Sequence, residues 1–336
     1  MTRRRVVVAP DKFKGTATAA QIAEAMAGAV QAAGATAVVV PMADGGEGTL
    51  AAFGGANRTR LVAGPLGDPV DAPWRLDRGV AVLEMAAASG LTLVGGPEEN
   101  DPLTASTTGT GELIAHAAEC GAEQIIVGVG GSASTDGGFG ALRAMYPLAR
   151  FRGVDLVVAC DVRTRFVDAA ATFAPQKGAS PAQVKLLERR LERLAQVYRE
   201  EHGVDVEPLL RAGAAGGLAG GLAVAGARLV DGFDVVADHV GLYDAIETAD
   251  LVLTGEGGLD STSFDGKVVG GVVSFAEAAG VPVAVIAGQA EADGAGRVPT
   301  RALVEQGSIE RALAEPTALV TEVLAAWLPD LLAPAG

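Results

Sequence analysis

Short apolar runs rich in β-branched residues recur along the chain, and each run ends in a polar, glycine-rich loop. The six runs, taken with the loops that follow them, cover residues 6–15, 38–49, 125–138, 156–161, 251–261 and 283–289. Strands of a parallel sheet are buried on both faces and therefore form near-continuous apolar runs. In α/β proteins, loops at the carboxyl ends of such strands hold ligands. The pattern therefore predicts six strands of parallel sheets, with functional residues in the loops after them.

Helix signals lie between these runs. Thr18 and Gln21 form a capping-box pattern before one helix, and Ser180 and Gln183 form a second such pattern. In the second helix the apolar residues of 184–198 follow a three-four spacing, which suits either a seam with a partner helix or a face packed on a sheet. The stripe is short for a helix seam, which favours packing on a sheet. The alternation of strands and helices predicts the α/β class with mainly parallel sheets.

The composition narrows the classes of function. The chain has 336 residues, which favours two domains, and a formal net charge of −15 at pH 7. Such a charge argues against nucleic-acid binding, which needs clustered Lys and Arg, but leaves room for a nucleotide held by a metal ion and a few cations. Two cysteines are too few for a disulfide framework and indicate the reduced cytoplasm. The apolar residues 213–227 are too short to span a membrane.

The loop after residues 125–128 carries a GxGxxA pattern, which begins at Gly128 and ends at Ala133. A dinucleotide-binding turn of this kind has an acidic residue about 20 positions further on. The nearest candidate is Asp161, 33 positions after Gly128, and the turn is more polar than a dinucleotide requires. We therefore favour a phosphate group over a nicotinamide dinucleotide as the ligand of this loop.

The same Gly/Ser run has the features of an anion site beside a cation site. The backbone amides of Gly130, Gly131 and Ser132 precede a predicted helix start, and such amides suit a phosphate. Asp136 follows them and is placed to contact a cation bound to that phosphate.

Two further loops combine glycines with charged residues. In residues 44–48, Asp44 fits a ligand-binding role and a turn cap equally well, whereas Glu47 fits a cap better. The loop after the 251–255 run holds Asp260, and Lys267 follows seven positions later. This acid and this lysine would form a simple ion pair or take part in a site, and the glycines around them favour the site.

Lysines in loops are conspicuous in so acidic a chain. Lys12 and Lys14 follow the first strand beside Asp11, and Lys177 lies in the loop APQKGAS. A single Lys usually serves solubility, but at the carboxyl end of a strand it is a candidate partner for a carboxylate or phosphate. No hydrolase nucleophile motif occurs. Acids for a metal, amides for phosphates and lysines for charge neutralisation together predict phosphoryl transfer.

Taken together and in order, these loops resemble the bacterial glycerate kinases of the type I family. The matching stretches are APDKFKGT, PMADGGEGT, LEMAAASGL, DPLTASTTGTGELI, IIVGVGGSASTDGG, ACDV, FAPQKGAS, GAAGGLAGGL and TGEGGLDSTSFDGK. The resemblance implies Mg²⁺-dependent transfer of a phosphoryl group from ATP to D-glycerate, usually at its 2-hydroxyl. It also implies a flavodoxin-like domain made of residues 1–60 and 250–336, with a second α/β domain, residues 61–249, inserted in it.

The resemblance and the loop chemistry together assign the site residues. Candidate catalytic residues are Asp161, Lys177, Asp260 and Lys267, with the base left open between Asp161 and Asp260. Candidate ATP contacts are Gly130, Gly131, Ser132, Gly255, Glu256 and Gly257. Candidate glycerate contacts are Asp11, Lys12, Lys14, Thr107 and Thr108. Candidate metal ligands are Asp44 and Asp136.

The chain departs from the family's pattern at a few places. Gly258 stands where the family has an arginine, Lys267 is followed by Val-Val in place of x-Pro, and the segment 143–158 is shorter than usual. Arg163 and Arg165 are candidate replacements for the missing arginine. Two alternatives therefore stay open: a kinase of a related small hydroxy acid, and a catalytically impaired relative that senses a nucleotide or an organic acid. Whether the protein forms a homodimer is also left open.

Overall fold

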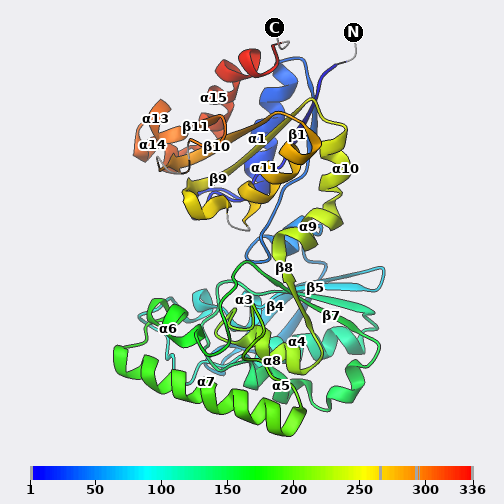
Figure 1. Ribbon diagram of the computed structural model, residues 1–336, viewed down its shortest axis with the longest axis vertical. Helices are drawn as coiled ribbons and strands as arrows, with labels where there is room; N and C mark the ends of the chain where they lie inside the picture. Colours follow the sequence, from blue (N-terminus) through cyan, green and yellow to red (C-terminus); the bar gives the residue numbers. More distant parts are fainter. Residues whose placement is uncertain (1–2, 265–266, 292–293, 295, 334–336) are drawn as a thin grey trace. The chain divides into compact units, whose positions relative to one another are not determined.

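The computed structural model describes residues 3–264, 267–291, 294 and 296–333, and the chain forms two compact units (Figure 1). Unit 1 is built from both ends of the chain, residues 1–43 and 236–336, and unit 2 is the segment 44–235 between them. Both boundaries fall earlier in the chain than the domain boundaries expected from the sequence. No helix in the described part of the chain combines the length and the apolar character needed to cross a membrane.

Unit 1 contains a five-stranded sheet in which every neighbouring pair is parallel. Its strands are β1 (Arg5–Val8), β2 (Thr36–Val39), β9 (Leu251–Leu259), β10 (Val283–Ala290) and β11 (Thr300–Ala302). Their order is β11-β10-β9-β1-β2. Counted within the unit, this is the 2-1-3-4-5 order of flavodoxin-like sheets, so the predicted fold is confirmed.

Helices cover both faces of this sheet (Figure 1). They are α1 (Ala19–Ala32), α10 (Leu242–Glu247), α11 (Val268–Ala279), α13 (Leu303–Gln306), α14 (Ile309–Ala314) and α15 (Pro316–Leu331), with α9 (Gly232–Val240) at the boundary with unit 2 and a 3₁₀ helix at Ser261–Phe264. Helices α1 and α15 share one core with β1, β9 and β10, in which Ile22, Met26 and Leu324 are fully buried. The predicted capping box of Thr18 and Gln21 opens α1.

Unit 2 contains a six-stranded mixed sheet. Its strands, in their spatial order, are β3 (Arg58–Ala63), β4 (Pro69–Asp77), β5 (Val80–Glu84), β6 (Gln124–Gly128), β7 (Asp155–Cys160) and β8 (Arg228–Asp231). The first three pair antiparallel, and β5 to β8 pair parallel. The carboxyl ends of four parallel strands therefore lie at one edge of the sheet.

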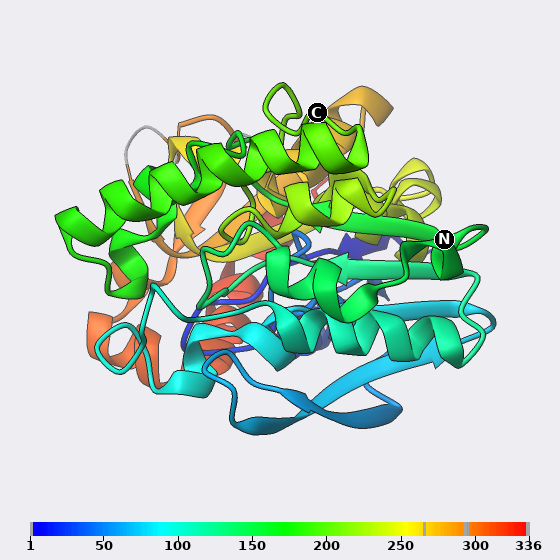
Figure 2. The same cartoon turned by 90° about the horizontal axis from the view of Figure 1, so that it is seen from below.

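The helices of unit 2 are α2 (Thr49–Ala52), α3 (Ala86–Ser89), α4 (Thr108–Glu119), α5 (Phe139–Met145), α6 (Ala169–Phe173), α7 (Pro181–His202) and α8 (Leu218–Val224), with 3₁₀ helices at Leu91–Val94, Leu148–Phe151 and Pro175–Lys177. Helix α7 is the long green helix of Figure 2, and the capping box of Ser180 and Gln183 opens it as predicted.

The apolar stripe of α7 is buried within unit 2, so the partner-helix alternative is not supported. Leu187, Leu191 and Tyr198 pack on Phe166 and on α6, however, and only one half-buried sheet residue, Leu229, borders this cluster. The expected packing on the sheet is therefore wrong. Helices α4, α5 and α8 pack on the sheet of unit 2. Helix α7 packs instead on the connection that follows β7, which contains Phe166 and α6.

Candidate active site

In unit 1 the candidate residues gather where β1 and β9 end. Strand β2 lies on one side of β1 and β9 on the other, so the order of the sheet reverses between β1 and β9. In open α/β sheets, ligands bind outside the carboxyl ends of the strands at this switch point. The backbone amide of Asp11 donates to the carbonyl of Gly255 at 2.8 Å, which joins the loop after β1 to the middle of β9.

The loop after β1 presents two lysines. Asp11 is buried, accepts a hydrogen bond from the backbone amide of Lys12 at 2.7 Å, and has its Oδ1 atom 3.7 Å from Lys12 Nζ. Lys14 is exposed, whereas Glu256 is buried. A Cβ atom at Gly257 would lie 3.1 Å from the backbone nitrogen of Lys14, so this glycine allows the two loops to approach closely. The predicted glycerate and ATP contacts of unit 1 are therefore neighbours.

Asp260 and Lys267 are connected through a residue that the sequence analysis missed. Lys267 Nζ donates to Thr262 Oγ1 at 3.0 Å, and Thr262 Oγ1 donates to Asp260 Oδ1 at 2.6 Å. The hydroxyl of Thr262 and, to a smaller extent, the charge of Lys267 lower the pKa of Asp260. Asp260 is therefore ionised at neutral pH. The hydroxyl-rich run Ser-Thr-Ser directly after Asp260 was the available signal; Asp265 and Gly266 of the same motif lie outside the described residues.

In unit 2 the loop 44–48 packs on the carboxyl edge of the parallel strands. Glu84, the last residue of β5, accepts hydrogen bonds from the backbone amides of Gly48 at 3.0 Å and Leu50 at 2.9 Å. A Cβ atom at Gly45 would lie 2.8 Å from the carbonyl oxygen of Ala159 in β7. Close packing therefore accounts for part of the glycine content of this loop. Glu84, which sequence reasoning missed, holds the loop in place.

Asp44 forms the turn cap that was one of its two predicted roles. Its Oδ1 atom accepts a hydrogen bond from the backbone amide of Gly46 at 3.1 Å. Glu47, expected to act as a cap, is exposed and has no hydrogen bond within the described part of the chain. A metal-binding role for Asp44 stays a prediction.

Lys177 lies beneath the Gly/Ser loop that follows β6. Its side chain is buried, and Nζ donates to Ser132 Oγ and to the carbonyl of Ser134, both at 2.6 Å. Burial lowers the pKa of Lys177 to about 7, and the negative charge of Asp136 partly opposes this shift. Lys177 therefore supports the loop that contains Gly130, Gly131 and Ser132.

Asp136 joins the starts of two helices. Its Oδ2 atom accepts hydrogen bonds from the backbone amide and hydroxyl of Thr107, at 2.9 and 2.8 Å, and from the amide of Gly140 at 3.2 Å. Its Oδ1 atom accepts from the amide of Gly138 at 3.1 Å. Thr107 precedes α4, and Gly138 precedes α5. Asp136 therefore stabilises both helix starts, and it also lines a groove of about 590 Å³ together with Thr108, Glu112 and Arg143.

The candidate ligands of the implied Mg²⁺ are the carboxylates of Asp44 and Asp136. Among the described residues, no group of three or more His, Cys, Asp or Glu side chains could hold a metal ion. Mg²⁺ usually keeps several waters and binds one or two carboxylates together with substrate phosphates, so such a group is not required. Asp136 accepts hydrogen bonds from Thr107, Gly138 and Gly140, and Asp44 accepts one from Gly46, so both carboxylates have structural roles and both stay candidate ligands.

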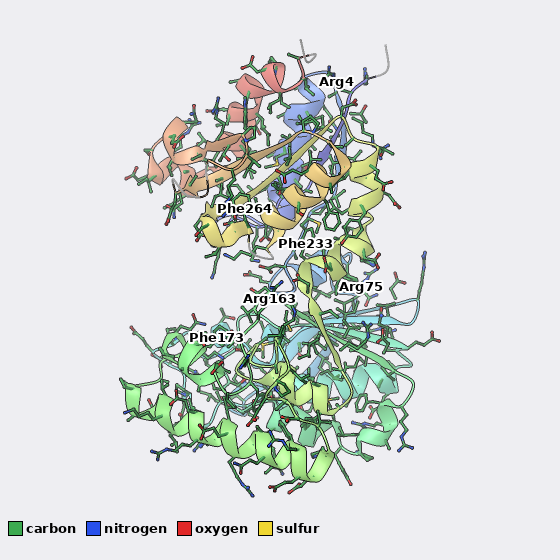
Figure 3. All side chains as sticks on the ribbon, in the orientation of Figure 1. Arg4, Arg75, Arg163, Phe173, Phe233 and Phe264 are labelled. Atoms are coloured by element: carbon green, nitrogen blue, oxygen red, sulfur yellow. The ribbon has the colours of Figure 1, made fainter. Side chains whose placement is uncertain are left out.

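Asp161 directly follows β7 and is half-buried. Next to it, Arg211 donates from Nη1 to the carbonyl of Cys160 at 3.1 Å and from Nη2 to Asp231 Oδ2 at 2.7 Å. No local pattern points to Arg211, because it lies 51 positions from Cys160 in the chain. Arg163 and Arg165, the expected replacements for the arginine absent at position 258, are exposed, and Arg163 is labelled in Figure 3.

Comparison with known proteins identifies similar chains over most of this length. Residues 6–146 and 147–326 match the model of the glycerate kinase family. The chain is 40% identical to a glycerate 2-kinase of Escherichia coli (strain K12) over 324 residues, which cover 84% of this chain and 85% of that protein. It is also 40% identical to a glycerate kinase of Halalkalibacterium halodurans, with the same shares covered.

A solved structure agrees with this similarity. A crystal structure of a Salmonella typhimurium LT2 protein, assigned as glycerate kinase 2, matches with a TM-score of 0.81 and 34% sequence identity. The match covers 99% of this chain and 100% of that one.

Proposed function

Since the chain belongs to the glycerate kinase family and is therefore a kinase, we propose that it transfers the γ-phosphoryl group of ATP to the 2-hydroxyl of D-glycerate. The products are ADP and 2-phosphoglycerate, and we place the reaction in the cytoplasm. The observation that carries the proposal is the pairing, at the β1/β9 switch point, of cationic Lys12 and Lys14 with the glycine-rich end of β9. Phosphoryl transfer depends mainly on positioning and on charge stabilisation, and this arrangement supports both.

Each unit contains groups that suit phosphoryl transfer. The ammonium groups of Lys12 and Lys14 bind and orient anionic oxygens. Asp260 is ionised and accepts a hydrogen bond from the hydroxyl of Thr262, which itself accepts one from Lys267 Nζ. These bonds orient the ammonium group of Lys267 for contact with a phosphoryl oxygen. In unit 2 the amides of Gly130, Gly131 and Ser132 bind phosphate, and Lys177 keeps their loop rigid.

The acceptor hydroxyl needs a carboxylate that takes its proton as the new bond forms. Asp161 and Asp260 are the two candidates, because each follows a strand at the carboxyl edge of its sheet. Thr107 and Thr108 stay candidate glycerate contacts, with Thr108 lining the groove beside Asp136. Mg²⁺, when bound, neutralises charge on the phosphoryl oxygens, and Asp44 and Asp136 are the residues that would hold it.

The decisive test measures ADP release with ATP, Mg²⁺ and a panel of acceptors that contains D-glycerate, L-glycerate, D-lactate and glycolate. We expect the highest kcat/KM with D-glycerate, and ³¹P NMR of the product should show 2-phosphoglycerate rather than 3-phosphoglycerate. Absence of turnover with every acceptor, together with a rise in melting temperature on adding nucleotide, would instead support the sensor alternative.

A related hydroxy acid is the second candidate acceptor. Arg143 lines the groove that contains Asp136 and Thr108, and it opens the segment 143–158 that is shorter than in the family. A changed boundary of this groove would alter the size of the acceptor. Higher kcat/KM for another member of the panel than for D-glycerate would favour this candidate.

A further inference from the structure

Arg211 adopts a backbone conformation that side chains rarely occupy. Its φ angle is +74°, in the left-handed region, and it precedes a glycine-rich stretch that ends at Gly221. Glycine would adopt this φ without steric strain, whereas a residue with a side chain pays a conformational penalty. The segment contains glycines at other left-handed positions, Gly216 and Gly217. Ala215 of the same segment also has a positive φ, +53°, so the conformation of Arg211 gains significance only from the contacts that its side chain makes.

The guanidinium group is fixed at the ends of two neighbouring strands. Its two hydrogen bonds reach the carbonyl of Cys160 and the carboxylate of Asp231, which are paired residues at the ends of β7 and β8. The side chains of Arg211 and Asp231 are only 14% and 18% exposed. The second oxygen of Asp231 accepts from the backbone amide of Phe233, which is labelled in Figure 3. Two of the five N–H donors of Arg211 are used, so the others are held in known directions.

A carboxyl-bearing residue follows the strand end at which this guanidinium group is fixed. Asp161 is bonded to Cys160, whose carbonyl receives Arg211 Nη1. Cys160 is also the register partner of Asp231, so Asp161, Asp231 and the guanidinium group of Arg211 belong to the same end of the β7/β8 pair. An α-hydroxy acid has a carboxylate and a hydroxyl on neighbouring carbons. A guanidinium group suits the carboxylate of such a ligand, and a carboxylate from the same strand end suits its hydroxyl.

We propose that Arg211 and Asp161 form the recognition pair for an α-hydroxy acid, with Arg211 binding its carboxylate and Asp161 its 2-hydroxyl. This inference rests on the proposed kinase function and extends it, because it assigns the acceptor to unit 2 and selects Asp161 over Asp260 as the base. In the transfer, the 2-hydroxyl oxygen forms a bond to the γ-phosphorus while the bond between that phosphorus and the leaving oxygen of ADP breaks. The hydroxyl proton passes to Asp161.

The test compares Arg211→Met with Arg228→Met as a matched control. Arg228 forms an ion pair with Asp155 across the same two strands, β8 and β7, but at their amino ends. We expect Arg211→Met to lower kcat/KM for D-glycerate by about 10- to 100-fold, as for the loss of one or two charge-assisted hydrogen bonds. KM for ATP should stay within about twofold of wild type in both variants, and Arg228→Met should leave both values unchanged.

Three further measurements separate recognition from a purely structural role. Arg211→Lys should recover part of the lost kcat/KM, because it keeps the charge without the planar fork. Asp161→Asn should lower kcat far more than it raises KM for D-glycerate. D-Glycerate binding measured calorimetrically without ATP should weaken in Arg211→Met and persist in Arg228→Met, and this readout does not depend on turnover.

Failure of the recognition pair and failure of the proposed kinase function would give different experimental results. Wild-type protein that binds D-glycerate but transfers no phosphoryl group would overturn the kinase proposal and leave the recognition pair standing. Equal loss of affinity for ATP and D-glycerate in Arg211→Met, or unchanged binding of D-glycerate, would overturn the recognition pair. Normal kcat in Asp161→Asn would remove the assignment of the base.

Discussion

Lys177 and Ser132 are 45 positions apart in the chain, yet Lys177 Nζ donates to Ser132 Oγ at 2.6 Å inside unit 2. The same ammonium group donates to the carbonyl of Ser134, and its side chain is buried. A buried ammonium group is stabilised by such hydrogen bonds and penalised by its lost hydration. The contact therefore makes the loop after β6 dependent on one buried, titratable residue.

This burial predicts a pH-dependent stability. Burial lowers the pKa of Lys177 from 10.5 to about 7, so between pH 7 and pH 10.5 the unfolded chain binds more protons at this residue than the folded chain. Stability rises with pH wherever the unfolded state binds more protons. The free energy of unfolding of the wild type should therefore increase relative to that of Lys177→Met as pH rises from 7 to 10, measured by urea unfolding.

Lys185→Met is the control for this experiment, because Lys185 lies exposed on α7. Its difference from wild type should stay constant over the same pH range. A constant difference for Lys177→Met as well would show that Lys177 keeps an ordinary pKa in the folded protein.

Thr262 links Asp260 to Lys267, and its hydroxyl should therefore matter for catalysis. Thr262→Val removes both hydrogen bonds while keeping the shape of the side chain, and we expect kcat to fall by about tenfold or more because Lys267 loses its fixed direction. Thr262→Ser keeps the hydroxyl and should retain most of the activity. Similar kcat values for the two variants would remove Thr262 from the active-site residues.

Gly45 is required by packing as well as by its backbone conformation. Gly45 and Gly153 have nearly the same φ, +91° and +89°, but a Cβ atom at Gly45 would meet Ala159 at 2.8 Å, whereas Gly153 has open space around it. Both alanine variants incur left-handed strain, and only Gly45→Ala adds a clash. We expect Gly45→Ala to lower the free energy of unfolding by about 1–3 kcal/mol more than Gly153→Ala. Equal decreases in the free energy of unfolding for the two variants would show that the loop moves away from β7 without loss of stability.

Gly258 stands where the resemblance to the glycerate kinases leads us to expect an arginine, and the space around it accepts a side chain. A Cβ atom at this position would have Gln289 Nε2, at 3.9 Å, as its nearest neighbour. Gly258→Arg should therefore fold with an unchanged melting temperature. If the added guanidinium contacts the transferring phosphoryl group, kcat should rise by about tenfold or more. Lower kcat with unchanged stability would show that the chain has adapted to the absence of this charge.

The site residues divide into those that local patterns can identify and those that only long-range contacts create. Asp260 and Lys267 follow one strand and were predicted together, whereas Thr262 between them was not singled out because a hydroxyl in a turn has many local roles. Asp136 was predicted as a metal ligand from its position after a phosphate-type loop. Its hydrogen bonds to Thr107, 29 positions away, add a structural role that no local pattern contains.

The sequence by itself determined the six predicted strands, which appear as β1, β2, β6, β7, β9 and β10, and the capping boxes of α1 and α7. Burial on both faces requires continuous apolar runs, and helix starts require local hydrogen-bond partners, so both are written in neighbouring residues. Only the tertiary structure decided that β3, β4 and β5, within residues 58–84, belong to unit 2, that Lys177 is buried, and that Arg211 contacts Cys160 and Asp231. These features depend on which distant segments pack together, and a guanidinium or ammonium group has no local preference that selects one distant partner over another.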